Sequence, residues 1–260
     1  MKKLGFIGMG NMAGAIACGI AKSGYLEGKD MIAYDINASQ LEKLNEYHFE
    51  IAQSEKEVVE KSEIVFVGVK PQVVEDVLRP LKESLKNKAI ISIVLGYDFD
   101  KYETLLDPST RHIFVMPNTP ALVLEGMSLI EEKNSLTDDE FEFTKGLFQS
   151  IGEVEIMPSR LMGVGGALSG CGPAFIYMII EALADGAVKE GMPRATAYKL
   201  ASQTVLGSGK MQLDTKLHPG ILKDNVCSPG GSTIRGVEAL ERGNVRASII
   251  DAISSSVHYK

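Results

Sequence analysis

The stretch Leu4-Gly5-Phe6-Ile7-Gly8-Met9-Gly10-Asn11-Met12-Ala13 decides the fold that we expect for this chain. A short apolar run ends in a glycine-rich turn, and a helical pattern follows to about Ser23. In such a unit the first glycine permits a tight turn, the second lets backbone approach a pyrophosphate, and the third position must be small. The helix N-terminus adds free N–H groups and partial positive charge. The turn therefore predicts a dinucleotide site made by Gly8, Met9, Gly10, Asn11 and Met12.

One carboxylate supports this interpretation. Asp35 ends the second predicted strand, residues 31–34, where an acid can accept hydrogen bonds from the adenosine ribose. The alternative is an ordinary tight turn with an unrelated acid nearby, and the surrounding pattern favours the dinucleotide. The same carboxylate would repel a 2′-phosphate, and no arginine follows closely, which favours NAD(H). Asn37, Ser39 and Gln40 could still bind a 2′-phosphate if Asp35 turned aside.

The first part of the chain alternates strand and helix signals. The runs 64–69 and 89–95 are almost continuously apolar, as strands covered on both faces are. Further strands are expected at 112–116, 127–130 and 153–157, with helices at 39–47, 55–61 and 72–85. Repeated β-α-β units predict an α/β fold with a doubly wound, Rossmann-type sheet over residues 1–160.

Residues 161–260 show helix signals and no convincing strand. The segment 173–190 is apolar around almost its whole circumference, so as a helix it must be buried on more than one side. In a helical region of only about 100 residues, this predicts burial against another subunit. We therefore expect a C-terminal all-helical dimerisation domain.

Composition excludes several classes of protein. The 260 residues are 45% hydrophobic and 23% charged, which is typical of a globular protein, and the net charge of −7 disfavours nucleic acid and anionic membranes as partners. The three cysteines and four histidines show no metal-ligand spacing, so no metal is expected, and a reducing cytoplasm fits best. No uninterrupted apolar run is long enough to span a bilayer.

Two proline-bounded turns follow predicted strands. The first is Val69-Lys70-Pro71-Gln72 and the second is Met116-Pro117-Asn118-Thr119-Pro120. Both fall at the carboxyl edge of the sheet, where ligands of this architecture bind, and together they suggest a shaped cleft. Lys70 could reach a cofactor or form only a surface salt bridge, and the sequence alone does not choose between these roles.

A second glycine-rich loop lies near the C-terminus. Ser228-Pro229-Gly230-Gly231-Ser232-Thr233 precedes a predicted helix, with Ser232 or Thr233 expected as the N-cap. Such a loop exposes N–H donors that suit a carboxylate. By spacing alone an ordinary capped turn is slightly favoured.

The chain resembles the Δ1-pyrroline-5-carboxylate reductase family along its full length. Besides the two glycine-rich loops and the two proline-bounded turns above, the resemblance rests on Leu168-Ser169-Gly170-Cys171-Gly172-Pro173-Ala174-Phe175, Glu181-Ala182-Leu183-Ala184-Asp185-Gly186, Lys189-Glu190-Gly191-Met192-Pro193, His218-Pro219-Gly220 and Asp224-Asn225-Val226. The C-terminal blocks in this order are specific to that family.

The resemblance implies hydride transfer from NAD(P)H to C5 of the cyclic imine 1-pyrroline-5-carboxylate, giving L-proline. It implies NADP(H) as the cofactor, with contacts from Val69, Lys70, Pro71, Asn118 and Asn225. The substrate carboxylate would lie on backbone N–H groups of Gly230, Gly231, Ser232 and Thr233, and the catalytic Thr233 hydroxyl would hydrogen-bond the ring nitrogen. The helical domains would interlock in a homodimer, within a larger ring such as a decamer.

Two rival interpretations remain open at this point. A β-hydroxyacid dehydrogenase or another imine reductase would share the cofactor loop, but the former uses a lysine where this chain has Gly170-Cys171-Gly172-Pro173. A non-catalytic NAD(P)H sensor would need the first loop and not the second, whereas both are intact here.

Overall fold

The computed structural model describes residues 1–258 of the chain, which form two compact units: Met1–Gly170 and a second unit from Cys171 onward. The elements of the first unit are β1 (Lys2–Ile7), α1 (Asn11–Ser23), η1 (Gly28–Asp30), β2 (Met31–Tyr34), η2 (Ala38–Tyr47), β3 (Glu50–Ile51), α2 (Glu55–Lys61), β4 (Ser62–Val67), η3 (Pro71–Val73), α3 (Val74–Leu78), η4 (Arg79–Leu81), β5 (Ala89–Ser92), α4 (Phe99–Leu105), β6 (Arg111–Met116), η5 (Thr119–Val123), β7 (Gly126–Glu131), α5 (Asp138–Gln149), β8 (Gly152–Met157) and α6 (Ser159–Ser169). The second unit contains α7 (Gly172–Lys189), α8 (Arg194–Thr215), α9 (Pro219–Val226), α10 (Ser232–Arg242) and α11 (Val245–Val257).

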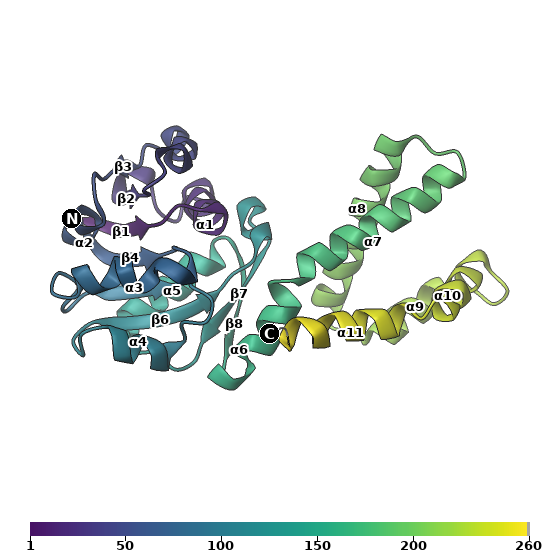
Figure 1. Ribbon diagram of the computed structural model, residues 1–260. Helices are drawn as coiled ribbons and strands as arrows, with labels where there is room; N and C mark the ends of the chain where they lie inside the picture. Colours follow the sequence, from purple (N-terminus) through teal and green to yellow (C-terminus); the bar gives the residue numbers. More distant parts are fainter. Residues whose placement is uncertain (259–260) are drawn as a thin grey trace. The chain divides into compact units, whose positions relative to one another are not determined.

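The first unit is built on one eight-stranded sheet in the order β3-β2-β1-β4-β5-β6-β7-β8. All neighbouring strands are parallel except β6 and β7. Helices cover both faces (Figure 1). One face buries Ile16 of α1 and Phe148 of α5, and the other buries Val58 of α2 and Tyr102 of α4. The doubly wound α/β fold predicted from sequence is confirmed.

The strand order places a switch point between β1 and β4. The chain leaves β1 for β2 on one side and later returns to place β4 on the other side of β1. In such sheets the ligand crevice lies beyond the carboxyl ends of the strands at this point. The turns after Ile7 and Val67 meet there.

The helix α6 packs on the sheet of the first unit. Met162 is buried with Phe114 and Leu129, and a side chain at Gly166 would collide with Met116. The predicted boundary at residue 160 assigns most of α6 to the C-terminal helical domain. The structure instead groups α6 with the first compact unit. The expected domain boundary at residue 160 stays a prediction.

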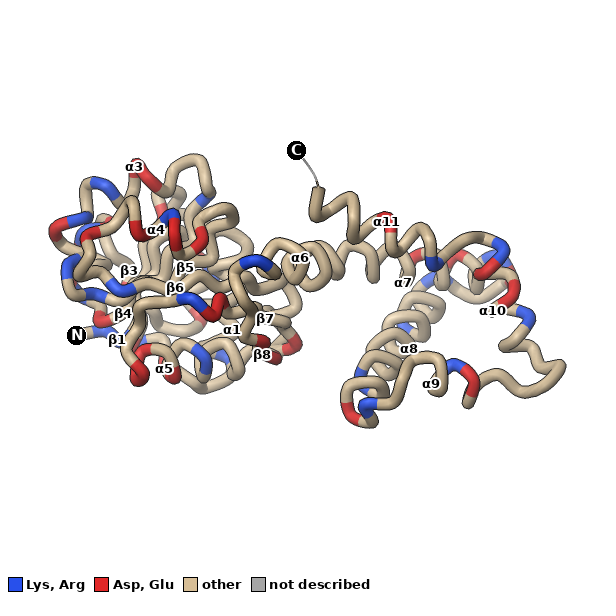
Figure 2. Tube along the Cα trace, turned by 90° about the horizontal axis from the view of Figure 1, so that it is seen from below, with Lys and Arg blue, Asp and Glu red and all other residues tan. Residues whose placement is uncertain are grey.

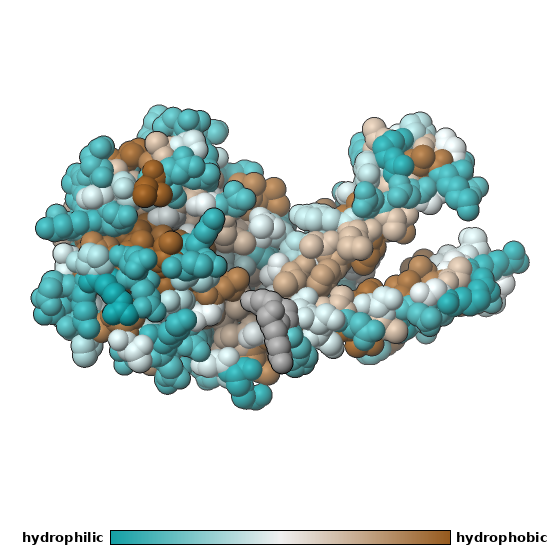
Figure 3. Space-filling view, viewed as in Figure 1, coloured by the Kyte–Doolittle hydropathy of each residue, from teal (hydrophilic) through white to brown (hydrophobic). Residues whose placement is uncertain are grey.

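The second unit is entirely helical over its described residues, and α7 and α8 form an antiparallel pair (Figure 1). It buries very few side chains: Ala184 of α7 and Ala197 and Ala201 of α8, with none from α9, α10 or α11. Large apolar residues lie exposed instead, among them Met178 and Leu183. Figure 3 shows this apolar surface along the helices of the unit.

The helix α6 and the first half of α7 are strongly apolar in sequence. Residues 161–180 contain no charged side chain, and Figure 2 shows them as an uninterrupted tan segment. By length and composition the stretch Ser159–Lys189 could cross a membrane. An apolar helix with few buried residues also suits an interface between subunits, as the sequence predicts for 173–190.

Candidate functional site: two glycine loops

The first loop turns tightly between β1 and α1. Gly8 has φ +86° and donates its N–H to the carbonyl of Tyr34 at 2.9 Å. A Cβ at this position would lie 2.8 Å from Cγ1 of Val69 and 2.9 Å from the carbonyl carbon of Gly68. Only glycine accepts this backbone conformation in so little space. The loop and the turn after β4 are therefore in direct contact.

The next two small residues have the roles that the motif predicts. A Cβ on Gly10 would meet nothing within 4 Å, so backbone is open to a ligand there. Ala13 lies against the turn after β4, because a Cβ at Gly68 would come within 2.6 Å of the Ala13 Cβ. The helix α1 begins at Asn11 with Gly10 as its N-cap and no side-chain cap among residues 1–258. Its first-turn N–H groups are left for an anion.

The other predicted residues of this loop differ in their exposure to solvent. Met9 is completely buried, and its N–H and carbonyl are bonded to Asp35 and Lys43. Asn11 is exposed and Met12 is half-buried. Contacts of these residues with a cofactor stay a prediction.

Asp35 is joined to the loop by hydrogen bonds. Its Oδ2 accepts from the Met9 N–H at 2.6 Å and its Oδ1 accepts from the Asn37 N–H at 2.8 Å. Each carboxylate oxygen has a second lone pair, so room is left to accept from ribose hydroxyls. Ile36, next in sequence, is 91% exposed and apolar, so this position offers no positive charge to a 2′-phosphate.

The turn after β4 presents Lys70 and Pro71 to solvent, while Val69 packs partly against the core. Within residues 1–258, no carboxylate lies within 4 Å of the Lys70 ammonium. The surface salt bridge that the sequence left open for Lys70 is absent from this part of the chain.

Asn118 is buried and already has protein partners. Its Oδ1 accepts from the Met127 N–H at 2.8 Å, and its Nδ2 donates to the Ser169 carbonyl at 3.0 Å. The side chain thereby fastens the turn after β6 to β7 and to the end of α6. Its predicted contact with a cofactor stays a prediction.

The second loop lies between α9 and α10. The Gly231 N–H donates to the Ser228 carbonyl at 3.0 Å, with Pro229 and then Gly230, at φ +71°, between them. Proline followed by a glycine with positive φ is the pattern of a type II turn. Asn225 lies exposed near the end of α9.

The N-cap expected at Ser232 or Thr233 is wrong. Gly231 is the N-cap of α10, with no side-chain cap within the described chain, and the helix begins at Ser232. The turn at Pro229 and Gly230 places Gly231 at the N-cap position, so Ser232 and Thr233 already lie inside the helix. Consequently the Ser232 and Thr233 N–H groups lie in the first helical turn without intrahelical acceptors, and both side chains are exposed.

Among residues 1–258, no three His, Cys, Asp or Glu side chains come together as a metal site.

The structure also brings Lys43 of η2 to the first loop, which sequence reasoning missed. Its Nζ lies 2.6 Å from the Met9 carbonyl oxygen. No motif marks this lysine, because only the packing of η2 beside α1 brings it there.

Two family models match the chain. Residues 159–260 match pyrroline-5-carboxylate reductase dimerisation, and residues 3–96 match NADP oxidoreductase, coenzyme F420-dependent. Each match covers one of the two glycine loops.

Named relatives match almost the whole chain. A pyrroline-5-carboxylate reductase of Escherichia coli is 40% identical over 97% of this chain and 95% of its own length. The crystal structure of Plasmodium falciparum pyrroline carboxylate reductase with NADP bound superposes with a TM-score of 0.89 at 31% identity, covering 98% of this chain and 95% of that one. A pyrroline-5-carboxylate reductase from Coxiella burnetii superposes with a TM-score of 0.88 at 30% identity, covering 98% and 96%.

Proposed function

The chain belongs to the pyrroline-5-carboxylate reductase family, and we propose how its two glycine loops divide the work of that reaction. The enzyme is an oxidoreductase of proline biosynthesis that reduces 1-pyrroline-5-carboxylate to L-proline. A hydride passes from the nicotinamide to C5 of the cyclic imine, and the ring nitrogen becomes the secondary amine of proline.

The first loop is the proposed cofactor site. Gly10, Asn11 and Met12 would offer backbone N–H groups to the pyrophosphate at the open start of α1, and Gly8 and Met9 would shape the turn that presents them. Asp35 would offer carboxylate oxygens to the adenosine ribose. Val69 adjoins this loop, and Lys70 and Pro71 follow it in the same turn. Family resemblance adds Asn118 and Asn225 as further proposed cofactor contacts. The observation that carries this proposal is the open backbone at Gly10 beside the uncapped helix.

The second loop is the proposed substrate site. Gly230, Gly231, Ser232 and Thr233 would hold the substrate carboxylate on backbone N–H groups at the start of α10. The iminium N–H would donate to the Thr233 hydroxyl, orienting C5 toward the hydride. Because the imine can take its proton from water before it binds, the enzyme needs to position and polarise it more than to supply a strong acid.

The cofactor site bears on the choice of dinucleotide. Family resemblance suggests NADP(H), while Asp35 favours NAD(H), since its carboxylate is held at the loop by two amides. We propose that both are used and that Asp35 weakens binding of the 2′-phosphate.

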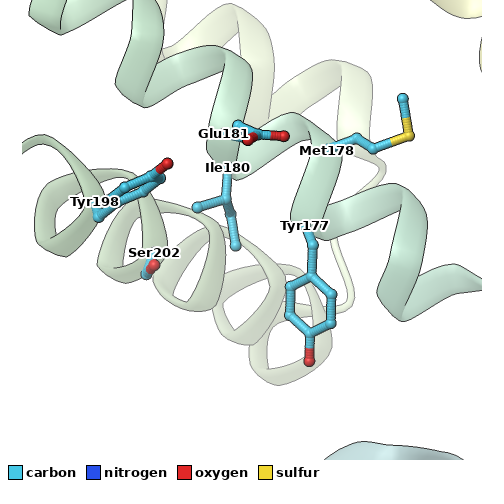
Figure 4. A pocket seen from close by; sticks show the side chains of 6 residues that line it. All are labelled: Tyr177, Met178, Ile180, Glu181, Tyr198 and Ser202. Carbon is cyan, nitrogen blue, oxygen red and sulfur yellow. The ribbon is translucent and has the colours of Figure 1, made fainter. Parts of the chain in front are cut away.

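The enzyme is proposed to act as a cytoplasmic homodimer, joined through the second unit and able to assemble into a ring such as a decamer. Support comes from the few buried side chains of that unit and from a groove of about 420 Å³ between α7 and α8. In Figure 4 Ile180 of α7 points toward Tyr198 and Ser202 of α8. A partner chain that covers these surfaces would also remove the apolar α7 from solvent without any membrane.

The direct test is reduction of 1-pyrroline-5-carboxylate by the purified protein, followed as loss of NADH or NADPH absorbance and as formation of proline. We expect turnover with both cofactors. Oxidation of neither cofactor in the presence of this substrate would refute the assignment.

A further inference from the structure

A lysine cation lies against the cofactor loop. Lys43 Nζ is 2.6 Å from the Met9 carbonyl oxygen, 3.4 Å from the Gly10 carbonyl oxygen and 3.2 Å from Oε1 of Gln40. These acceptors are all neutral, and no carboxylate within residues 1–258 lies within 4 Å of the ammonium. Its charge is therefore directed at the loop backbone and not at an acid.

Met9 is also held at its N–H, by the negatively charged carboxylate of Asp35. The Met9 N–H donates to the Asp35 carboxylate at 2.6 Å, while the Met9 carbonyl accepts from Lys43. The Met9 side chain is completely buried, which anchors the residue a third time. Charge-assisted hydrogen bonds are stronger than neutral ones, so both polar groups of Met9 are held in fixed directions.

The direction of the Met9 carbonyl determines where the next N–H points. A trans peptide is planar, so its N–H and C=O point in opposite directions. With the Met9 carbonyl held toward Lys43, the Gly10 N–H must point away from it. The structure gives that N–H no acceptor within residues 1–258, and the space beside Gly10 is open.

Because Gly14 of α1 has no side chain, there is room for the Lys43 side chain to pass over the helix. A Cβ at Gly14 would lie 2.2 Å from Lys43 Nζ and 2.5 Å from its Cε. The lysine thus crosses the surface of α1 at a position where a side chain is missing. This fit links Lys43, Gly14 and the loop in a single arrangement.

We infer that Lys43 is a positioning residue for the dinucleotide: it holds the Met9 carbonyl so that the Gly10 N–H faces the pyrophosphate. The inference rests on the proposed cofactor site and goes beyond it by assigning the orientation of the loop to a side chain outside the loop. Lys43 raises the affinity of NADH and NADPH equally, since the pyrophosphate is common to both.

The test is titration of NADH and NADPH by fluorescence in the absence of substrate, with Lys43→Met, Lys43→Arg and Lys22→Met. Hydrogen bonds to charged groups are typically worth enough to change affinity about tenfold. We expect Lys43→Met to raise both dissociation constants by about that factor and to leave kcat at saturating cofactor within about twofold. Lys43→Arg should restore part of the affinity. Lys22, an exposed lysine of α1, is the matched control and should have no effect.

A second variant tests the arrangement without removing the charge. Gly14→Ala displaces the flexible end of Lys43 and suits a helix, since alanine is the better helix former. It should weaken both cofactors as Lys43→Met does, and combining the two should add little to either. Unchanged dissociation constants in Lys43→Met, or fully additive effects, would overturn the inference. Because binding is measured without substrate, its failure is separate from a failure to turn over pyrroline-5-carboxylate.

Discussion

At residue 35 a carboxylate stabilises the first glycine loop and lies where we propose that the adenosine ribose of the cofactor binds. Asp35 accepts from the Met9 and Asn37 N–H groups, so its charge is fixed where β2 ends. Among the proposed cofactor residues, it is the one whose negative charge would disfavour the 2′-phosphate that distinguishes NADP(H) from NAD(H).

Replacing Asp35 by asparagine should shift the cofactor preference toward NADPH. Removing one negative charge near the 2′-phosphate should raise the ratio of kcat/KM for NADPH to that for NADH about tenfold. Steady-state kinetics with both cofactors measure this ratio. Glu42→Gln removes a charge from the exposed side of the same η2 segment and is the control. An unchanged ratio in Asp35→Asn would show that the carboxylate does not select the cofactor.

Thr233 tests the substrate loop at the same scale. Thr233→Ala removes the proposed hydrogen-bond partner of the ring nitrogen, and turnover should fall about tenfold or more. Cofactor affinity should stay nearly unchanged, and Thr233→Ser, which keeps the hydroxyl, should retain most of the activity. If cofactor binding fell instead, the loop would have to be reassigned to the dinucleotide.

The helix α5 shows how one element is fastened to the sheet. Thr137 and Glu140 form a capping box at its start, and Arg111 of β6 makes two hydrogen bonds to the Glu140 carboxylate, at 2.7 and 2.8 Å. Hydrogen bonds from Arg111 hold the pKa of Glu140 below its ordinary value. The Glu140 carboxylate therefore stabilises the fold in its charged form.

The Arg111–Glu140 ion pair predicts that the free energy of unfolding depends on pH. A carboxyl whose pKa is lower in the folded state contributes its full stabilisation above the ordinary glutamate pKa of about 4.3 and loses it as pH falls through the folded pKa. Glu140→Gln should cost about 1 kcal/mol at pH 7, after discounting for partial exposure. The cost should shrink as pH falls below about 4.3. Urea unfolding of both proteins across this range measures it, and a cost independent of pH would contradict the assignment to the ion pair.

At the element scale, apolar runs were a good guide where burial decides the structure. Strand β2 and helix α2 have the predicted bounds, and β4 and β6 differ by a few residues. The predicted strand 89–95 ends at Ser92, because Ser92 Oγ accepts from the Val94 N–H and turns the chain. The helix expected at residues 39–47 is present as a 3-10 helix over residues 38–47. Strand β3, too short for a pattern, was missed.

The site was predictable where a local motif encodes it and not where packing creates it. The tight turn at Gly8, the small residue Ala13 and the position of Asp35 follow from neighbours in sequence. The approach of Lys43 to the loop depends on how η2 packs beside α1. Likewise, the partners of Asn118 come from β7 and α6, which no spacing in the sequence connects to it.

At the scale of the whole molecule, the second unit presents its apolar residues to solvent. Met178 is 69% exposed and Leu183 is 49% exposed, both on α7. Burying a large apolar side chain contributes roughly 1.5–3 kcal/mol, so a partner that covers this helix gains much stability.

The double variant Met178→Glu and Leu183→Glu should therefore separate the subunits. Two carboxylates in an apolar interface should raise the dimer dissociation constant at least about a thousandfold. Light scattering after size exclusion should then give the mass of one 28.1 kDa chain. Ile51→Glu, on strand β3 at one edge of the sheet, is the control and should remain a dimer. A double variant that keeps the mass of the unmodified protein would exclude α7 as the interface.

The scarcity of buried residues after Cys171 also has a consequence for synthesis on the ribosome. The first unit has its own core and can fold once α6 has emerged, because nothing in its sheet waits for later residues. Within residues 171–258 only Ala184, Ala197 and Ala201 are buried, so this part of the chain has no comparable core of its own. In a newly made chain the apolar helices would therefore stay exposed until the partner that we propose covers them, and during that interval they are the part that chaperones or aggregation would engage.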